Sequence, residues 1–294
     1  MGLRLKFNLV LLAVMLAALA GSAVAARQML QDNARAEVVR EARLMLEAAS
    51  AVRSYTIDHV RPHLVQQMAE VFLPPTVPAF AATEAINNLR RHYGDYSYKE
   101  ATLNPTNPRN RTVDWEADVV QQFRQYPDRG EIIAERQAAA GRSLFIARPI
   151  QVTHAACLQC HSTPAVAPAS LLRLYGDANG FGWKQGEIVG AQIVSVPMDV
   201  PLAHAERTFA AFLVVLGVVF LLTFLALNLM LGALILRPVR RMSLAADRVS
   251  TGDFAEPEFA ERGTDELAVL RSSFNRMRRS LEKAMQMIHA SPRP

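Results

Sequence analysis

The sequence predicts an α+β protein in which one folded domain lies between two membrane-spanning helices and is followed by a helical module. Two long apolar blocks without a charged residue predict the membrane helices. Residues 27–70 contain no glycine and space their apolar residues as a helix does, which predicts one long helix. Residues 144–152 and 187–196 are rich in β-branched residues that partly alternate with polar ones, as in strands.

The apolar blocks cover residues 7–26 and 208–236. A helix rises about 1.5 Å per residue, so about 20 residues cross a hydrocarbon core of about 30 Å. The second block is longer than one crossing requires, which favours a tilted helix. Ala23-Val24-Ala25 has the small residues of a signal-peptide cleavage site, so removal of the first block is an open alternative.

The charge pattern predicts the orientation in the membrane. The chain has a net charge of +5, but residues 27–207 hold 19 basic and 19 acidic residues and are therefore neutral. Basic residues lie on the outer flanks of the two blocks: Arg4, Lys6, Arg237, Arg240 and Arg241. This pattern favours membrane topology over nucleic-acid binding. We expect residues 1–6 and the segment after 236 in the cytoplasm, and residues 27–207 in the periplasm, at a bacterial inner membrane.

The chain has two cysteines, and both lie in Cys157-Leu158-Gln159-Cys160-His161. C-x-x-C-H is the attachment motif of c-type haem: the thiols form thioethers with the haem vinyl groups, and the histidine is the proximal iron ligand. We therefore expect one covalent haem c on Cys157 and Cys160, with His161 as the proximal ligand. The alternatives are a disulfide, a thioredoxin-like redox pair and half of a zinc site, and the flanking sequence does not clearly support them.

The sixth iron ligand is not determined by the motif. A further cysteine is excluded, and the first candidates are Met45, His59 and His63. His59 and His63 are four residues apart on the predicted long helix and so share a face, and Met45 precedes them on it. For any single one of these residues, core packing of the methionine or a surface or hydrogen-bonded position of the histidine is the better explanation. Water or a gas at the iron is also an alternative.

Two irregular segments accompany the motif. The Asn- and Pro-rich segment 103–110 predicts a loop, because proline cannot occupy a helix interior or a central strand. Gly180-Phe181-Gly182-Trp183 predicts a turn whose aromatic residues are candidates to pack on the porphyrin or in the core. Helices are predicted over 82–92 and 115–125.

The order of these motifs resembles the bacterial periplasmic c-type haem sensor domains with a PAS-like fold. The resemblance rests on the segment 51–56, the Asn-Pro loop, Cys157–His161 and 190–198, and it covers about residues 30–205. It implies a central antiparallel sheet with a long N-terminal helix, haem on Cys157 and Cys160, and His161 as proximal ligand. Members of the family differ in the distal ligand, and some use a cysteine that this chain lacks.

Residues 237–289 resemble a HAMP domain, which has two parallel helices per chain and four in a dimer. A connector of about 15 residues begins at Gly252, and Asp265-Glu266-Leu267 opens the second helix. This helix carries seven apolar residues at alternating spacings of three and four: Leu267, Leu270, Phe274, Met277, Leu281, Ala284 and Ile288. Such a seam predicts packing against a partner helix, and hence a homodimer, with a helix lying on the membrane surface as the alternative. Residues 290–294 form a tail.

These features predict a membrane-bound sensor without enzymatic activity and without catalytic residues. A redox change or a diatomic gas at the haem would shift the external domain, the second membrane helix and the HAMP helices. Only six residues follow Ile288, so we expect the output to pass to a separate cytoplasmic signalling protein. The alternatives are a membrane-anchored monohaem c-type cytochrome that transfers electrons and, more weakly, a haem peroxidase. No nucleic-acid partner is expected.

Overall fold

The structure is a computed structural model that describes residues 2–138, 141–260 and 263–290. Its contacts divide the chain into two units, one formed by Val24–Ala210 and the other by Met1–Ala23 together with Ala211–Pro294. Two helical stretches, Leu3–Glu70 and Asp199–Ser250, are long and apolar enough to cross a membrane. This is the property that the two uncharged blocks predicted.

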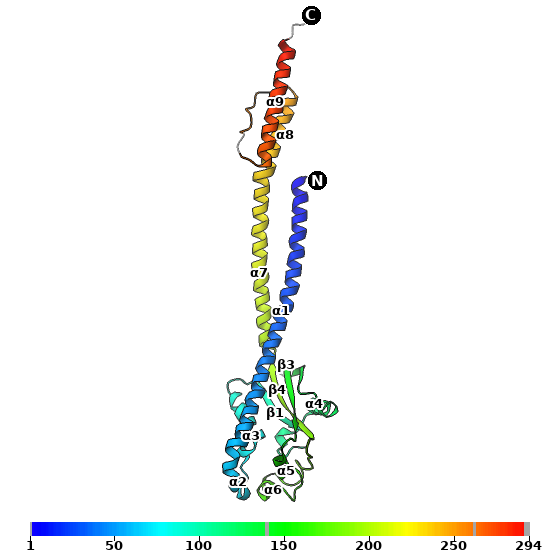
Figure 1. The fold of residues 1–294 in the computed structure, drawn as a ribbon, viewed down its shortest axis with the longest axis vertical. Helices are drawn as coiled ribbons and strands as arrows, with labels where there is room; N and C mark the ends of the chain where they lie inside the picture. The colour runs from blue at the N-terminus through cyan, green and yellow to red at the C-terminus, as the bar shows by residue number, and fades with distance from the viewer. Residues whose placement is uncertain (1, 139–140, 261–262, 291–294) are drawn as a thin grey trace. The chain divides into compact units, whose positions relative to one another are not determined.

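The unit Val24–Ala210 is built around a four-stranded antiparallel sheet with strand order β1-β4-β3-β2 (Figure 1). The strands are β1 (Ser97–Thr102), β2 (Ile132–Ala138), β3 (Gly141–Gln151) and β4 (Ile188–Pro197). The sequence predicted β3 and β4, which are the two central strands, and it missed the two edge strands. With helices around this sheet, the predicted α+β class is confirmed.

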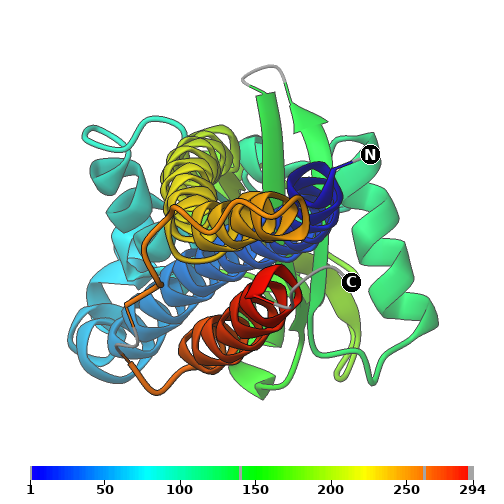
Figure 2. The ribbon, with the colours of Figure 1, turned by 90° about the horizontal axis from the view of Figure 1, so that it is seen from above.

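The sheet has an apolar core on each face, because successive side chains of a strand point to opposite sides. Val194 and Val196 of β4 belong to a core that includes α1 (Leu3–Tyr55) and α3, whereas Ala191 and Ile193 belong to a core that includes α4. Figure 2 shows α3 and α4 on opposite sides of the sheet. The helices that complete this unit are α3 (Pro78–Leu89), α4 (Asp114–Gln125), α5 (Ala155–His161) and α6 (Ala169–Tyr175).

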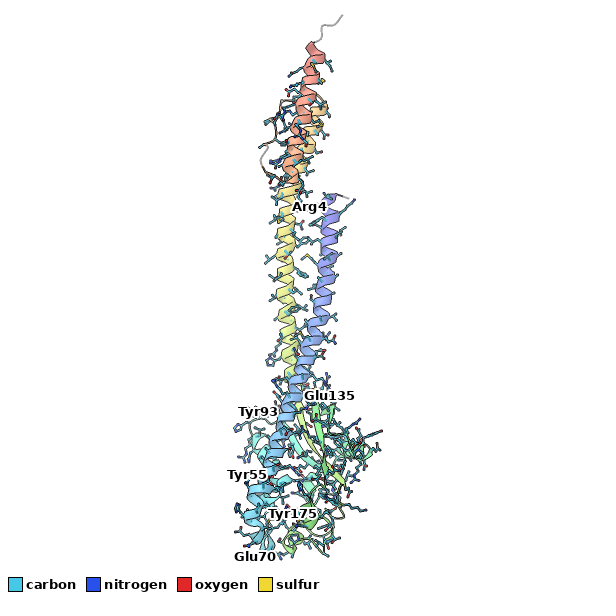
Figure 3. All side chains as sticks on the ribbon, in the orientation of Figure 1. Arg4, Tyr55, Glu70, Tyr93, Glu135 and Tyr175 are labelled. Atoms are coloured by element: carbon cyan, nitrogen blue, oxygen red, sulfur yellow. The ribbon has the colours of Figure 1, made fainter. Side chains whose placement is uncertain are left out.

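The predicted long helix is interrupted once. α1 (Leu3–Tyr55) continues through a π-helical segment, η1 (Thr56–Val60), into α2 (Arg61–Glu70). Pro62 lies in the first turn of α2, and its missing N–H removes a donor at the point where the backbone departs from α-helical geometry. At the end of α2, Arg173 of α6 donates a hydrogen bond of 2.5 Å to the carbonyl oxygen of Glu70. Figure 3 accordingly shows Glu70 and Tyr175 at the same end of the unit.

β4 leads almost directly into the second apolar stretch. Met198 follows the strand and is 1% exposed, packed in the core beside α1, and α7 (Asp199–Met230) begins at the next residue. A second π-helical segment, η4 (Leu231–Leu236), then joins α7 to α8 (Arg237–Ser250). β4 and α7 are therefore joined by a single residue, without an intervening loop.

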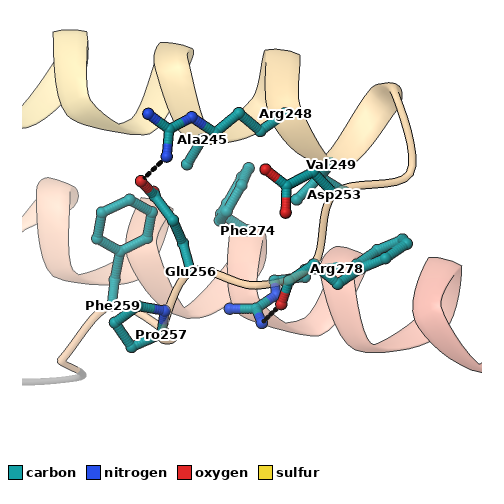
Figure 4. A pocket seen from close by; sticks show the side chains of 10 residues that line it. Ala245, Arg248, Val249, Asp253, Glu256, Pro257, Phe259, Phe274 and Arg278 are labelled. Carbon is teal, nitrogen blue, oxygen red and sulfur yellow. Dashed lines mark hydrogen bonds and ion pairs between the residues drawn. The ribbon is translucent and has the colours of Figure 1, made fainter.

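α8 and α9 (Glu266–Ala290) pack together through a small apolar cluster. Phe274 of α9 packs in this cluster with residues of α8, including Ala245 and Val249, as Figure 4 shows around the pocket between the helices and their connector. Asn275 is fully buried and holds the connector in place. Its side chain accepts a hydrogen bond from the Phe259 N–H at 3.1 Å and donates one to the Phe259 carbonyl at 2.8 Å. This part of the chain has the two-helix organisation that its sequence predicted.

Candidate functional site

A cavity of about 330 Å³ lies in the unit Val24–Ala210 and contains the Cys-x-x-Cys-His motif in its wall. Its size is within the range of small-molecule and cofactor sites. The wall combines apolar residues with polar and charged ones. The apolar residues are Ile57, Met68, Phe72, Pro74, Val77, Pro78, Ala79, Phe80, Pro105, Ile150, Val152, Ala156, Leu171, Trp183 and Val189.

α5 presents both thiols to this cavity. Cys157 and Cys160 are three residues apart on the helix and therefore share a face. Both are free and partly buried, and both line the cavity. Burial raises the pKa of the Cys160 thiol, and the positive charge of Arg61 acts in the opposite direction. The two sulfurs are thus available to one molecule in the cavity.

His161, the last residue of α5, has its ring held from two sides. Its Nδ1 lies 2.7 Å from the carbonyl oxygen of Gly180, and its ring stacks on Trp183 at 3.9 Å between centroids and 11° between planes. Because a carbonyl can only accept, Nδ1 carries the proton and Nε2 is left as the basic nitrogen. Burial lowers the pKa of His161, which favours the neutral ring that binds a metal.

The carbonyl that orients His161 is itself fixed by the Asn-Pro loop. Asn104 accepts a hydrogen bond from the Gly180 N–H at 3.2 Å and donates one to the Phe181 carbonyl at 3.5 Å. Gly180 has φ +85°, and a Cβ there would lie 1.9 Å from Oγ1 of Thr106. Only glycine therefore allows the turn to approach the loop this closely.

Backbone hydrogen bonds join the same turn to the end of α5. The Gly182 N–H donates to the Ser162 carbonyl at 2.8 Å, and the Trp183 N–H donates to the His161 carbonyl at 3.2 Å. The sequence singled out the loop 103–110 and the turn 180–183 separately. It carried no signal that the two segments meet, because they are far apart in the chain.

A helical wall lines another part of the cavity. Arg53, Ile57 and Arg61 follow one another at intervals of four residues along α1, η1 and the start of α2, and all three line the cavity. Arg53 forms an ion pair with Glu100 of β1, whose side chain is 3% exposed. The Tyr98 hydroxyl donates to Glu100 at 2.7 Å, and the Gln192 amide donates to the Tyr98 oxygen at 3.1 Å. No local sequence pattern marks these residues, because the ion pair joins positions that are 47 residues apart.

The three candidates for the sixth ligand do not lie among the described residues that line this cavity. Met45 is 7% exposed and packs in the core between α1 and the sheet. His59 and His63 are exposed. Each lies two residues from a cavity-lining residue of the same helical stretch, which turns it to roughly the opposite side. The structure therefore brings Cys157, Cys160 and His161 together and leaves Met45, His59 and His63 outside the cavity.

Comparisons with known proteins identify two parts of the chain. Residues 31–197 match the family model described as Tll0287-like, and residues 230–283 match the HAMP domain. The heme sensor protein HssS of Staphylococcus aureus, in strains JH9 and Newman, is 34% identical over 96 residues. That alignment covers 32% of this chain and 20% of HssS, so the chain spans about a fifth of the length of these curated relatives.

Among solved structures, the crystal structure of the cyanobacterial heme-protein Tll0287 aligns with 55% of this chain and 95% of its own, at 16% identity and a TM-score of 0.41. The two family matches agree with the resemblance that the sequence motifs predicted, a haem sensor domain followed by a HAMP domain. Because the first match covers more than half of the chain, this protein belongs to the Tll0287-like family and carries a HAMP domain after its second apolar helix.

Proposed function

We propose that this protein is a membrane-bound sensor that carries one covalent haem c and relays the state of that haem through its HAMP domain. The observation that carries the proposal is the common cavity of Cys157, Cys160 and His161, in which the hydrogen bond to Gly180 leaves Nε2 of the histidine as the basic nitrogen. The names of the relatives, a heme sensor and a heme-protein, support the same cofactor.

The residues around the cavity fit haem. The two thiols supply the thioether sulfurs, and His161 supplies the proximal nitrogen in a fixed tautomer. The apolar wall suits a porphyrin face, and Trp183 holds the ring of His161 in place. When bound, haem would supply an iron that can change its charge on reduction and can bind a small ligand.

The connection of the sheet to the second apolar helix supports a relay. Met198 is buried in the core that α1 and β4 share, and α7 starts at Asp199. A change in the cavity that shifts β4 would thus act on α7 through the backbone. The HAMP helices would then shift from one packing arrangement to another in response to the movement of α7.

The exposed seam of α9 supports a homodimer. In the single chain Leu270, Met277, Leu281 and Ile288 are 47%, 48%, 43% and 67% exposed, although they hold heptad spacing. Burying an apolar side chain of this size contributes roughly 1.5–3 kcal/mol, so a second copy of α9 would stabilise the seam strongly.

We infer that the stimulus is a redox change or a diatomic gas, and that the output passes to a separate cytoplasmic signalling protein.

The basic flanks support an inner-membrane location with the haem domain in the periplasm, where c-type haem is attached. A reporter that is active only in the periplasm should be active when fused after residue 207 and silent when fused after 290. The reverse pattern would contradict this orientation.

The HAMP match favours sensing over an anchored electron-transfer cytochrome, because an anchor needs no two-helix relay.

Haem staining of the full-length protein tests the central claim. Protein produced with a cytochrome c maturation system should keep its haem on a denaturing gel, and Cys157→Ala or Cys160→Ala should remove most of the stain. Leu158→Ala lies between the two thiols and should leave it unchanged. Full staining of the Cys157→Ala/Cys160→Ala double variant would refute covalent attachment.

A further inference from the structure

The helical wall formed by α1, η1 and α2 lines the same cavity as the attachment cysteines. Arg53, Ile57 and Arg61 share one face of this helical stretch and line the cavity together with Cys157 and Cys160. A group attached to both thiols would therefore share the cavity with this wall.

Among the described residues of this wall, the segment from Arg53 to Arg61 presents no side chain to the cavity that binds iron as an ordinary axial ligand. Three other cavity-lining residues are of ligand type, Met68, His154 and Tyr175. The ring of Tyr175 packs edge-on against Phe72 at 5.9 Å between centroids. The sulfur of Met68 accepts a hydrogen bond from Thr76 at 2.9 Å, and Met68 is 8% exposed, packed away at the end of α2. His154 precedes Cys157 by three residues and therefore belongs to the attachment segment, not to the wall that faces it.

The charges that line the cavity are mostly positive. Arg53, Arg61 and Arg109 contribute three guanidinium groups, and Glu100 is the one carboxylate among the described lining residues. Glu100 is already paired with Arg53 and bonded by Tyr98. Arg109 pairs with Glu84, which lies outside the cavity wall, while Arg61 has no ion pair within the described part of the chain. The cavity therefore has an excess of positive charge beside an apolar face.

We infer that the space between the haem and this wall binds a small inorganic anion, held by Arg53 and Arg61, in place of a sixth ligand from the protein. This inference rests on the proposed haem. Guanidinium groups bind anions through short, charge-assisted hydrogen bonds. Arg53 has five N–H donors and shares them with Glu100, so it can be held in position by the carboxylate and still donate into the cavity. Ile57 adds an apolar side chain to the same wall, between the two arginines along the chain.

Ligand titration of the oxidised full-length holoprotein tests the inference, with azide as the anionic probe and imidazole as the neutral one. Azide should shift the Soret band at saturation in the wild type. Arg61→Gln should weaken azide binding about tenfold, the equivalent of one charge-assisted hydrogen bond, and should change imidazole binding less than about twofold. Arg129→Gln, an exposed cation beside Tyr126 on another part of the domain, should change neither.

A second variant tests the same position by adding a ligand. Ile57→Met would place a thioether on the wall, and it should convert the spectrum to a low-spin form and block azide. Haem staining is read in every sample, so a loss of attached haem refutes the proposed function separately. Attached haem that binds no azide in the wild type, or binds it equally in Arg61→Gln, overturns the inference. The inference is also overturned if Arg61→Gln changes only the pH dependence of the reduction potential, because Arg61 would then bind the carboxylates of the haem.

Discussion

Arg53 of α1 and Glu100 of β1 form an ion pair in the wall of the cavity, and they link the long N-terminal helix to the edge of the sheet. Tyr98 and Gln192 extend the contact to β4, the strand that leads into α7. Burial raises the pKa of Tyr98, and the charge of Glu100 raises it further, so the phenol stays neutral and donates to the carboxylate. One polar network thus joins the cavity to both chain segments that continue into apolar helices.

The network should stabilise the domain. Glu100→Gln removes the negative charge beside Arg53, and we expect it to lower the free energy of unfolding by about 2 kcal/mol. The cost stays below that of a fully buried pair because 26% of the Arg53 side chain is exposed. Both tryptophans, Trp115 and Trp183, lie in the unit Val24–Ala210, so fluorescence during urea unfolding reports this unit alone.

The matched control is Glu37→Gln, which breaks an exposed pair with Arg40 on α1. Exposed pairs of this kind contribute about 0.5 kcal/mol or less. If Glu100→Gln and Glu37→Gln have the same unfolding midpoint, the buried network contributes nothing beyond a surface ion pair.

Asn104 should control the orientation of His161. Asn104→Ala removes both hydrogen bonds to the turn at Gly180, so the carbonyl that fixes the tautomer of His161 is no longer held. We expect the haem to stay attached while the Soret band broadens and the spin state becomes mixed. Optical and electron paramagnetic resonance spectra of the purified protein measure this. Asn88→Ala, an exposed residue of α3, is the control and should leave both spectra unchanged.

The buried His161 predicts a pH dependence of the form without haem. Because burial lowers its pKa in the folded state, the unfolded chain binds the proton more readily. Stability from this group is therefore full above about pH 6.5, the ordinary histidine pKa, and declines as the pH falls from there towards the folded pKa. Urea midpoints of the Cys157→Ala/Cys160→Ala variant between pH 7.5 and 5 test this. Adding His161→Gln should flatten the curve, and an unchanged slope would assign the dependence to other groups.

The same histidine should matter differently once haem is bound. His161→Ala should leave the thioethers intact but remove the proximal nitrogen, which shifts the Soret band and the spin state. The stain on a denaturing gel and the visible spectrum separate the two effects. An unchanged spectrum in the presence of full staining would mean that the iron takes its nitrogen from elsewhere.

Cross-linking tests the HAMP dimer. Cysteines at Leu270 and Met277, which are exposed in the single chain, should form disulfides between subunits in membranes. Arg279→Cys lies on the polar face and should not. Phe274 is 9% exposed because it packs against α8 of its own chain, so Phe274→Cys should cross-link less than its place in the seam suggests. A relay also requires the pattern to differ between oxidised and reduced haem. Equal cross-linking at all positions would refute the seam.

The sequence alone determined the features that depend on local spacing. The two apolar helices, the central strands β3 and β4, the Cys-x-x-Cys-His motif and the paired helices α8 and α9 are each encoded within one continuous segment. A thiol pair on one face of α5, or a seam along α9, needs no information from the rest of the chain. These features were predictable because covalent spacing and helical periodicity specify them.

Only the tertiary structure decided which distant segments surround the motif. The acceptor of His161 is a backbone carbonyl at Gly180, held in turn by Asn104, and neither contact has a signature at the level of residue type. Strand β1 (Ser97–Thr102) was missed because its Lys and Glu oppose a strand pattern, and Glu100 is tolerated in the core only because Arg53 neutralises it from α1. The positions of Met45, His59 and His63 likewise follow from which side of the helical stretch faces the sheet and the cavity. Helical spacing determines which residues share a face of the helix, whereas tertiary packing determines which face lines the cavity.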